Sequence, residues 1–119
     1  MSDAPLRILR EPLARDELAS IAAVQFGDMV KAVVDVALGT MAIGGDMHAD
    51  EEAILLDAGS RQGDLWGINL YPGERGDGWI EFDSMINVRP AQGNRGRDVE
   101  DESLRLSIRR IVAALVTDA

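Results

Sequence analysis

The chain has 119 residues, of which 21 are acidic and 12 basic, for a net charge of −9, and it contains no cysteine. The length suits one domain, expected to span residues 1–119, and the lack of cysteine excludes disulfides, thiolate metal sites and thiol catalysis. The acidity disfavours long nucleic acids and anionic membranes as partners. Without a visible signal or membrane-spanning segment, we expect a soluble, cytoplasmic protein of prokaryotic type.

Residues 1–10 are expected to be irregular, and a helix is predicted after them. Pro12 stands where a helix begins, and Asp16 and Glu17 suit the positive end of the helix dipole. Apolar residues then recur at helical spacing until Gly27, which is a typical stop signal.

Two runs rich in apolar residues, 29–37 and 40–43, are separated by Leu38-Gly39. A two-residue loop that contains glycine between two such runs is typical of a β-hairpin. The register that closes this loop places Val34 opposite Ile43. Residues 46–58 follow and are ambiguous: acids ahead of a short apolar run favour a short helix, while the same run leaves a strand open.

A second hairpin is predicted from residues 65–71 and 79–88, around a loop rich in glycine. In the later strand apolar residues alternate with polar ones, and this period of two indicates one buried and one polar face. Asn69 is expected to lie near Glu81 on the polar face.

The last helix is the clearest element, with either Asp98 or Asp101 as its cap. Its apolar residues form one stripe: Leu104, Ile108, Ile111, Val112 and Leu115. We expect this stripe to pack on Val34, Ile43, Phe82 and Ile86. The predicted fold class is α+β, a two-layer sandwich in which amphipathic helices cover a four-stranded, largely antiparallel sheet of two hairpins, in the order α-β-β-α-β-β-α.

Six strings of the sequence are distinctive: 26–35, 41–45, 48–50, 65–72, 79–90 and 92–95. Together they resemble a family of short prokaryotic proteins that is catalogued only as a domain of unknown function. The likeness covers nearly the whole chain. It implies membership of that family but no activity, so candidate site residues are argued from chemistry.

The first candidate cluster contains Asp46, His48 and the acids at 50–52. His48 is the only histidine, so any imidazole-dependent step requires it. Imidazole with carboxylates suits Mn²⁺, and carboxylates with water suit Mg²⁺. The same acids also describe an ordinary helix start.

The second cluster is Glu81 and Asp83, with Asn69 beside them on the polar face. Neighbouring carboxylates repel unless a cation, a proton or an arginine compensates, as in a metal site or an acid–base pair. Exposed charges paired with Lys31 or Arg89 are the simpler explanation.

The third cluster is the arginine loop, residues 89–97, in which Arg89, Asn94, Arg95 and Arg97 are candidate ligand-binding residues. Its glycines allow backbone N–H groups to converge on an anion, and arginine forks match phosphate or carboxylate oxygens. The alternative is a surface loop whose arginines pair with the abundant acids. The loop lacks the lysine and hydroxyl residue of a P-loop.

We therefore expect a non-catalytic binding module without a cofactor, which engages a protein or a small anionic ligand. Its ligand-binding residues would be Asn69, Glu81, Asp83, Arg89, Asn94, Arg95 and Arg97. The alternative is a phosphoester hydrolase that depends on a divalent metal held by Glu81, Asp83, Asp46 and His48. Convergence of the carboxylates in one pocket would favour the hydrolase, and a flat carboxylate face would favour the binding module.

Overall fold

Five antiparallel strands form the central sheet of the computed structural model, which describes residues 6–118. Their spatial order is β1-β4-β3-β5-β6. The strands are β1 (Arg7–Leu9), β3 (Val30–Asp35), β4 (Thr40–Ile43), β5 (Leu65–Leu70) and β6 (Ile80–Glu81). A separate parallel pair joins β2 (Leu13–Ala14) to β7 (Val116–Thr117).

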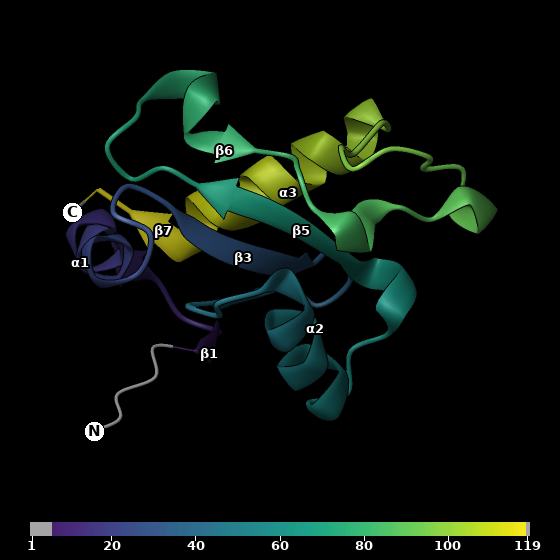
Figure 1. Ribbon diagram of the computed structural model, residues 1–119, viewed down its shortest axis with the longest axis horizontal. Helices are drawn as coiled ribbons and strands as arrows, with labels where there is room; N and C mark the ends of the chain where they lie inside the picture. Colours follow the sequence, from purple (N-terminus) through teal and green to yellow (C-terminus); the bar gives the residue numbers. More distant parts are fainter. Residues whose placement is uncertain (1–5, 119) are drawn as a thin grey trace.

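The helices cover both faces of this sheet. They are α1 (Arg15–Val24), α2 (His48–Asp57) and α3 (Glu102–Leu115), with short 3₁₀ turns at Gln62–Asp64, Gly76–Trp79, Met85–Asn87 and Pro90–Gln92. Figure 1 shows α2 on one side of the sheet and α3 on the other. The predicted α+β class is confirmed. The predicted two-layer sandwich with a four-stranded sheet is wrong, because the sheet has five strands and helices lie on both of its faces.

Each face of the sheet has its own apolar cluster, which explains the extra layer. Val34 and Ile68 pack in the cluster that contains Ile108 of α3, whereas Val33 packs in the cluster that contains Leu55 of α2. Strand β3 is therefore buried on both faces, and its centre, residues 32–34, is an apolar run rather than an alternating pattern.

The chain before α1 is more regular than predicted. Residues Arg7–Leu9 pair with β4, where an irregular segment was expected for 1–10, and residues 1–5 lie outside the described part of the chain. The helix begins at Arg15 and not at Pro12, because Leu13–Ala14 pairs with β7.

The β3–β4 hairpin is confirmed, but its predicted register is wrong by two residues. The structure pairs Val34 with Met41, and Asp35 with Thr40. The cause is the side chain of Asp35, which accepts hydrogen bonds from the backbone N–H groups of Ala37 and Leu38, both at 2.9 Å. This Asx turn lengthens the loop. A shift of two residues keeps every side chain on its predicted face.

The second hairpin is shorter than predicted, because β6 ends at Glu81 and residues Met85–Asn87 form a 3₁₀ turn. The backbone of Gly67 is instead paired by the side chain of Asn87, which donates to the Gly67 carbonyl at 2.9 Å and accepts from its N–H at 2.8 Å. A Cβ at residue 67 would lie 2.5 Å from that of Ser84, so glycine is required for this close approach.

The predicted helices at 46–58 and in the last segment are confirmed. Asp101 caps α3 by accepting from the N–H groups of Ser103 and Leu104, which settles the choice between Asp98 and Asp101. Ile108 is fully buried in the α3 cluster, while Ile86 packs in the α2 cluster, contrary to the expectation that it faces α3.

Candidate functional site

A cavity of about 420 Å³ lies where the start of α2 meets the start of β3 and the ends of β5 and β6. We call it the sheet-end pocket. Its polar lining consists of Lys31, Asp46, His48, Asn69, Glu81, Asp83, Ser84 and Arg97. The structure thus brings together the first two predicted clusters and one residue of the arginine loop.

Lys31, Asn69 and Glu81 form a row across three strands. β3 pairs Lys31 with Asn69, and β5 pairs Asn69 with Glu81. The Asn69 side-chain amide donates to Glu81 Oε1 at 2.9 Å, which confirms that these two residues adjoin. The hydroxyl of Tyr71 donates to the same oxygen at 3.1 Å. The two hydrogen bonds therefore hold the Glu81 side chain in place at the pocket.

The other end of the Asn69 amide has no partner. Asn69 is only 5% exposed, and within residues 6–118 its Oδ1 accepts no hydrogen bond. A buried acceptor of this kind costs about 1–3 kcal/mol unless a donor reaches it. Asn69 Oδ1 has almost no accessible surface, so this oxygen is unpaired among the described residues without being open to the pocket.

The two cations of the pocket differ. Arg97 donates to Asp83 Oδ1 at 2.7 Å, and both side chains are about half exposed. Lys31 has no carboxylate within 4 Å among the described residues. Its ammonium lies 5.4 Å from the centre of the Phe26 ring. Lys31 is therefore the cation available to an anionic group.

His48, in the first turn of α2, is buried with its Nε2 2.8 Å from the carbonyl oxygen of Ile68. A carbonyl only accepts, so Nε2 carries the proton and Nδ1 is an acceptor in the neutral ring. Burial lowers the pKa of His48, which the contact with Ile68 partly opposes. The neutral imidazole holds α2 against the sheet.

Glu51 lies behind the pocket and is fully buried. Its Oε2 accepts from the backbone N–H of Gly45 at 2.9 Å, and its Oε1 has no partner among the described residues. Burial raises the pKa of Glu51 to about 9, although Gly45 and Lys31 oppose the shift. In the sequence Glu51 belongs to the acids of a predicted helix start, and no local pattern reveals that it is buried.

The four residues proposed to hold a metal, Asp46, His48, Glu81 and Asp83, line the same pocket. Across residues 6–118, however, no three histidine or acidic side chains are close enough to share one ion. The proposed clusters converge on one cavity without forming a compact ligand set.

The three arginines of the arginine loop lie in different environments. Arg89 donates to the carbonyl oxygens of Ile86 and Leu65, and its guanidinium lies 4.6 Å from the centre of the Trp66 ring. Burial lowers the pKa of Arg89, which Glu52, 3.8 Å away, partly opposes. Arg89 therefore fastens the loop to the start of β5.

The backbone N–H groups of the arginine loop, which were expected to bind an anionic ligand, already bind a carboxylate of the protein itself. Glu100 Oε2 accepts from the N–H groups of Arg95 and Gly96, at 2.8 and 3.2 Å. The Arg95 side chain is exposed and makes no hydrogen bond or ion pair with the rest of the described chain. Of the three arginines, only Arg97 lines the sheet-end pocket.

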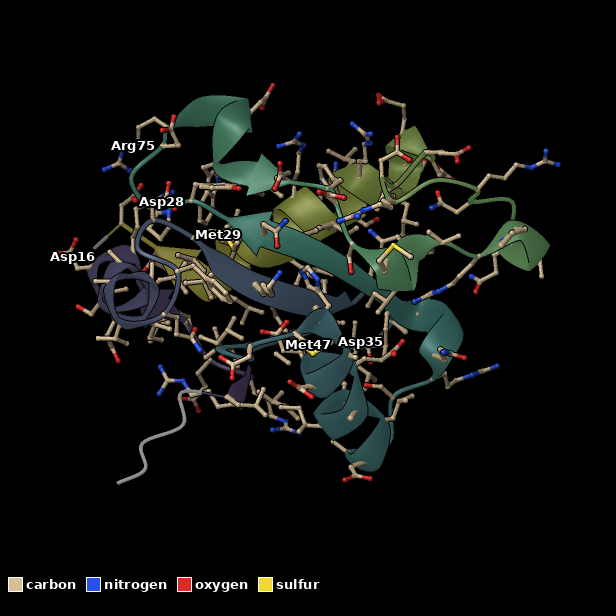
Figure 2. All side chains as sticks on the ribbon, in the orientation of Figure 1. Asp16, Asp28, Met29, Asp35, Met47 and Arg75 are labelled. Carbon is tan, nitrogen blue, oxygen red and sulfur yellow. The ribbon has the colours of Figure 1, made fainter. Side chains whose placement is uncertain are left out.

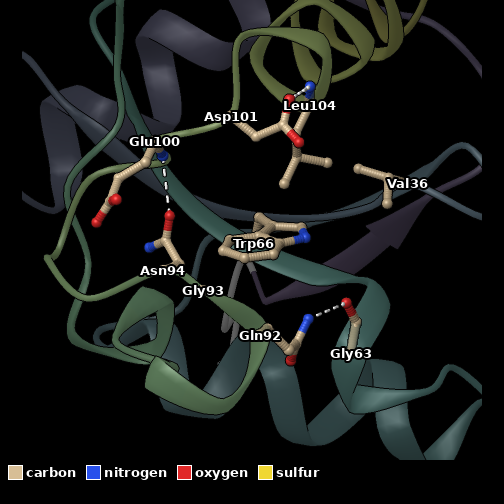
Figure 3. A pocket seen from close by; sticks show the side chains of 9 residues that line it. All are labelled: Val36, Gly63, Trp66, Gln92, Gly93, Asn94, Glu100, Asp101 and Leu104. Atoms are coloured by element: carbon tan, nitrogen blue, oxygen red, sulfur yellow. Dashed lines mark hydrogen bonds between the residues drawn. The ribbon is translucent and has the colours of Figure 1, made fainter.

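Asn94 organises the loop. Its amide donates to the carbonyl oxygens of Asn87 and Asp98, at 2.7 and 2.6 Å, and its Oδ1 accepts from the N–H of Glu100 at 2.9 Å. Figure 3 shows Asn94 and Trp66 among the residues that line a second cavity, of about 520 Å³. Since its polar atoms are engaged, Asn94 shapes the loop around it.

No helix in the part of the chain that the structure describes is long and apolar enough to cross a membrane. A search of curated proteins and a search of solved structures each gave no match. A family model described as a protein of unknown function, DUF5674, matches residues 7–115, which is nearly the whole chain. This protein therefore belongs to the DUF5674 family, as its resemblance to a domain of unknown function implied.

Proposed function

We propose that this protein is a non-catalytic binding module that holds a small polar molecule with an anionic group in the sheet-end pocket. The observation that carries the proposal is the environment of Lys31, which lines this pocket and has no ion pair among residues 6–118. The anionic group of a ligand would provide that ion pair.

The arginine loop contributes less to this proposal than the sequence suggested. Glu100 fills the backbone anion site at Arg95, and Arg89 is held against Trp66. Arg97 remains as a second cation in the pocket, partly neutralised by Asp83. The binding surface therefore shifts from the loop to the end of the sheet.

The test is a thermal-shift screen with inorganic phosphate, α-amino acids, short carboxylic acids and nucleotides. At a hundredfold excess over Kd, a ligand adds about 2.7 kcal/mol to the free energy of unfolding. A ligand of the pocket should raise Tm in wild type and in Arg95→Met but not in Lys31→Met. The two variants are matched, because each removes one positive charge. The proposal is wrong if no compound raises Tm, or if Lys31→Met responds as wild type does.

A second candidate is the metal-dependent phosphoester hydrolase. It is favoured by the shared cavity that Asp46, His48, Glu81 and Asp83 line together with Arg97. In such an enzyme the carboxylates would hold the ion and Arg97 would bind the phosphate. A divalent-metal titration, described in the Discussion, separates it from the binding module.

A further inference from the structure

Apolar side chains accompany Lys31 at the sheet-end pocket. Its ammonium lies 5.4 Å from the centre of the Phe26 ring, and Met29, two residues earlier in the chain, lines the same cavity. Figure 2 shows Met29 near the start of β3 and Met47, which also lines the cavity, beside the start of α2. An anion bound to Lys31 would therefore have apolar atoms of the protein close by.

The carboxylates of the pocket are distributed differently. Glu81 on β6 lies two strand spacings from Lys31 on β3, because β5 runs between these strands. Neighbouring strands are about 4.8 Å apart, so the two positions are about 10 Å from each other. Within residues 6–118 neither Glu81 nor Asp46 forms an ion pair, whereas Asp83 is paired with Arg97.

This charge balance selects ligands by their number of negative charges. Lys31 compensates one charge of a bound anion. A second charge finds no further cation in the pocket, because Asp83 engages Arg97, and it is repelled by Asp46 and Glu81. The pocket should accordingly take a carboxylate in preference to a phosphate dianion.

Methionines supply an adaptable apolar lining for the rest of the ligand. Three of the five in the chain, Met29, Met47 and Met85, line the cavity. Met47 is 59% exposed and Met85 65% exposed, although both are large apolar side chains. Flexible, polarizable thioethers adapt to apolar groups, and a cavity of about 420 Å³ is large enough for a chain of several carbons.

We infer that the ligand of the sheet-end pocket is a short aliphatic monocarboxylate. Its carboxylate pairs with Lys31, and its carbon chain contacts Met29, Met47 and Met85. The ionised carboxylate makes the molecule polar and supplies its single negative charge. The inference rests on the proposed function and adds the ligand class.

Two ligands of the same shape test the preference for one charge. At pH 8 butyl sulfate carries one negative charge and butyl phosphate carries two, because the second pKa of a phosphate monoester is about 6. Calorimetric titration at about 0.01 M salt, where screening is weak, should give butyl sulfate a Kd at least about tenfold lower.

Removal of either unpaired carboxylate, by Asp46→Asn or by Glu81→Gln, should reduce this ratio of Kd values several-fold. Both substitutions are at exposed sites, and Asp57→Asn, at an exposed site outside the pocket, should leave the ratio unchanged. Equal Kd values for the two esters in wild type would overturn the inference, and so would an unchanged ratio in both pocket variants.

The series acetate, butanoate and hexanoate tests the apolar contact. Each methylene that the methionines cover should tighten binding by up to about fourfold, so hexanoate should bind at least about tenfold more tightly than acetate. In a Met47→Ser/Met85→Ser double variant this gain should fall several-fold. Hexanol, which lacks the carboxylate, should bind at least about tenfold more weakly than hexanoate. A flat series, or hexanol that binds as well as hexanoate, would overturn the inference.

Failure of the ligand class and failure of the binding module give different results. If the carboxylates do not bind while phosphate or a nucleotide still raises Tm in wild type but not in Lys31→Met, the ligand class is wrong and the binding module stands. If no compound binds, both proposals fall.

Discussion

The side-chain amide of Asn87 makes both hydrogen bonds that a neighbouring strand would otherwise make to the backbone of Gly67. Asn87 is fully buried, and its Nδ2 also donates to the carbonyl of Arg97 at 3.0 Å. One side chain therefore joins β5 to the loop that delivers Arg97 to the sheet-end pocket. The loop is fixed by this contact rather than by a continued strand.

Replacing Asn87 by alanine should destabilise the protein strongly. The N–H and C=O of Gly67 would both lose their partner in a buried position, at a cost of about 2–4 kcal/mol in total. Denaturant unfolding of Asn87→Ala measures this loss. Gln92→Ala, at an exposed site of the same segment, is the control and should change the free energy of unfolding by less than about 0.5 kcal/mol. Equal effects at the two sites would show that the Asn87 contacts are unimportant.

The apolar residues of α3 should differ in how much each contributes to the free energy of unfolding. Ile108 is fully buried, so Ile108→Ala should cost about 2–5 kcal/mol through lost burial and the cavity left behind. Leu106 on the same helix is 48% exposed, and Leu106→Ala should cost much less. Unfolding of both variants in urea gives the comparison. A loss below about 0.5 kcal/mol for Ile108→Ala would mean that the packing of α3 differs from the structure.

Glu51 should make stability fall as pH rises. The folded protein keeps its carboxyl group protonated up to a pKa of about 9, while the unfolded chain loses the proton near the ordinary value of 4.5. The stabilisation is fully present below the unfolded pKa and is lost as pH rises through the folded pKa. Between them the free energy of unfolding falls by up to about 1.4 kcal/mol per pH unit from this group.

The Glu51→Gln variant tests this sign. Glutamine stays neutral and retains an acceptor for the Gly45 N–H, so most of the downward slope between pH 5.5 and 8.5 (roughly the window between the two values) should disappear. Asp57→Asn, at an exposed position of the same helix, should keep the slope of wild type. If Glu51→Gln and wild type follow the same curve, Glu51 is ionised in the folded protein.

Divalent metals should discriminate between the two candidate functions. If the hydrolase is correct, millimolar Mn²⁺ or Mg²⁺ raises Tm, because the ion binds only the folded state, and Asp83→Asn abolishes the rise. Asp57→Asn, at an exposed position on α2, should leave it unchanged. A flat response of wild type to both ions would exclude the metal-dependent hydrolase.

The sequence predicted the elements whose pattern is local. The alternation around Ile80 and Phe82 placed Asn69 beside Glu81, and the apolar stripe defined α3. The predictions from the sequence were wrong where a side chain takes the place of a backbone hydrogen-bond partner. Asn87 ends the second hairpin early and Asp35 lengthens the turn of the first, and neither contact leaves a periodic trace.

Part of the sheet-end pocket was named from the sequence, but its arrangement was not, and Lys31 was named only as a counterion. Asp46 and His48 line the same pocket as Glu81 and Asp83 because the His48 ring, at the start of α2, contacts the carbonyl of Ile68 in β5. That contact joins segments 20 residues apart. The role of Glu100 was missed because a count of charges cannot show which carboxylate accepts hydrogen bonds from the backbone N–H groups of the arginine loop.

The parallel pairing of β2 with β7 has a consequence for protein synthesis. Leu13 lies beside Val116, so its place in the core cannot be completed until the ribosome has released nearly all of the described chain. Pairing over so long a sequence separation closes a large loop and slows folding. A nascent chain stalled before β7 would keep Leu13 uncovered, and this exposed apolar surface is the kind that chaperones bind and proteases attack.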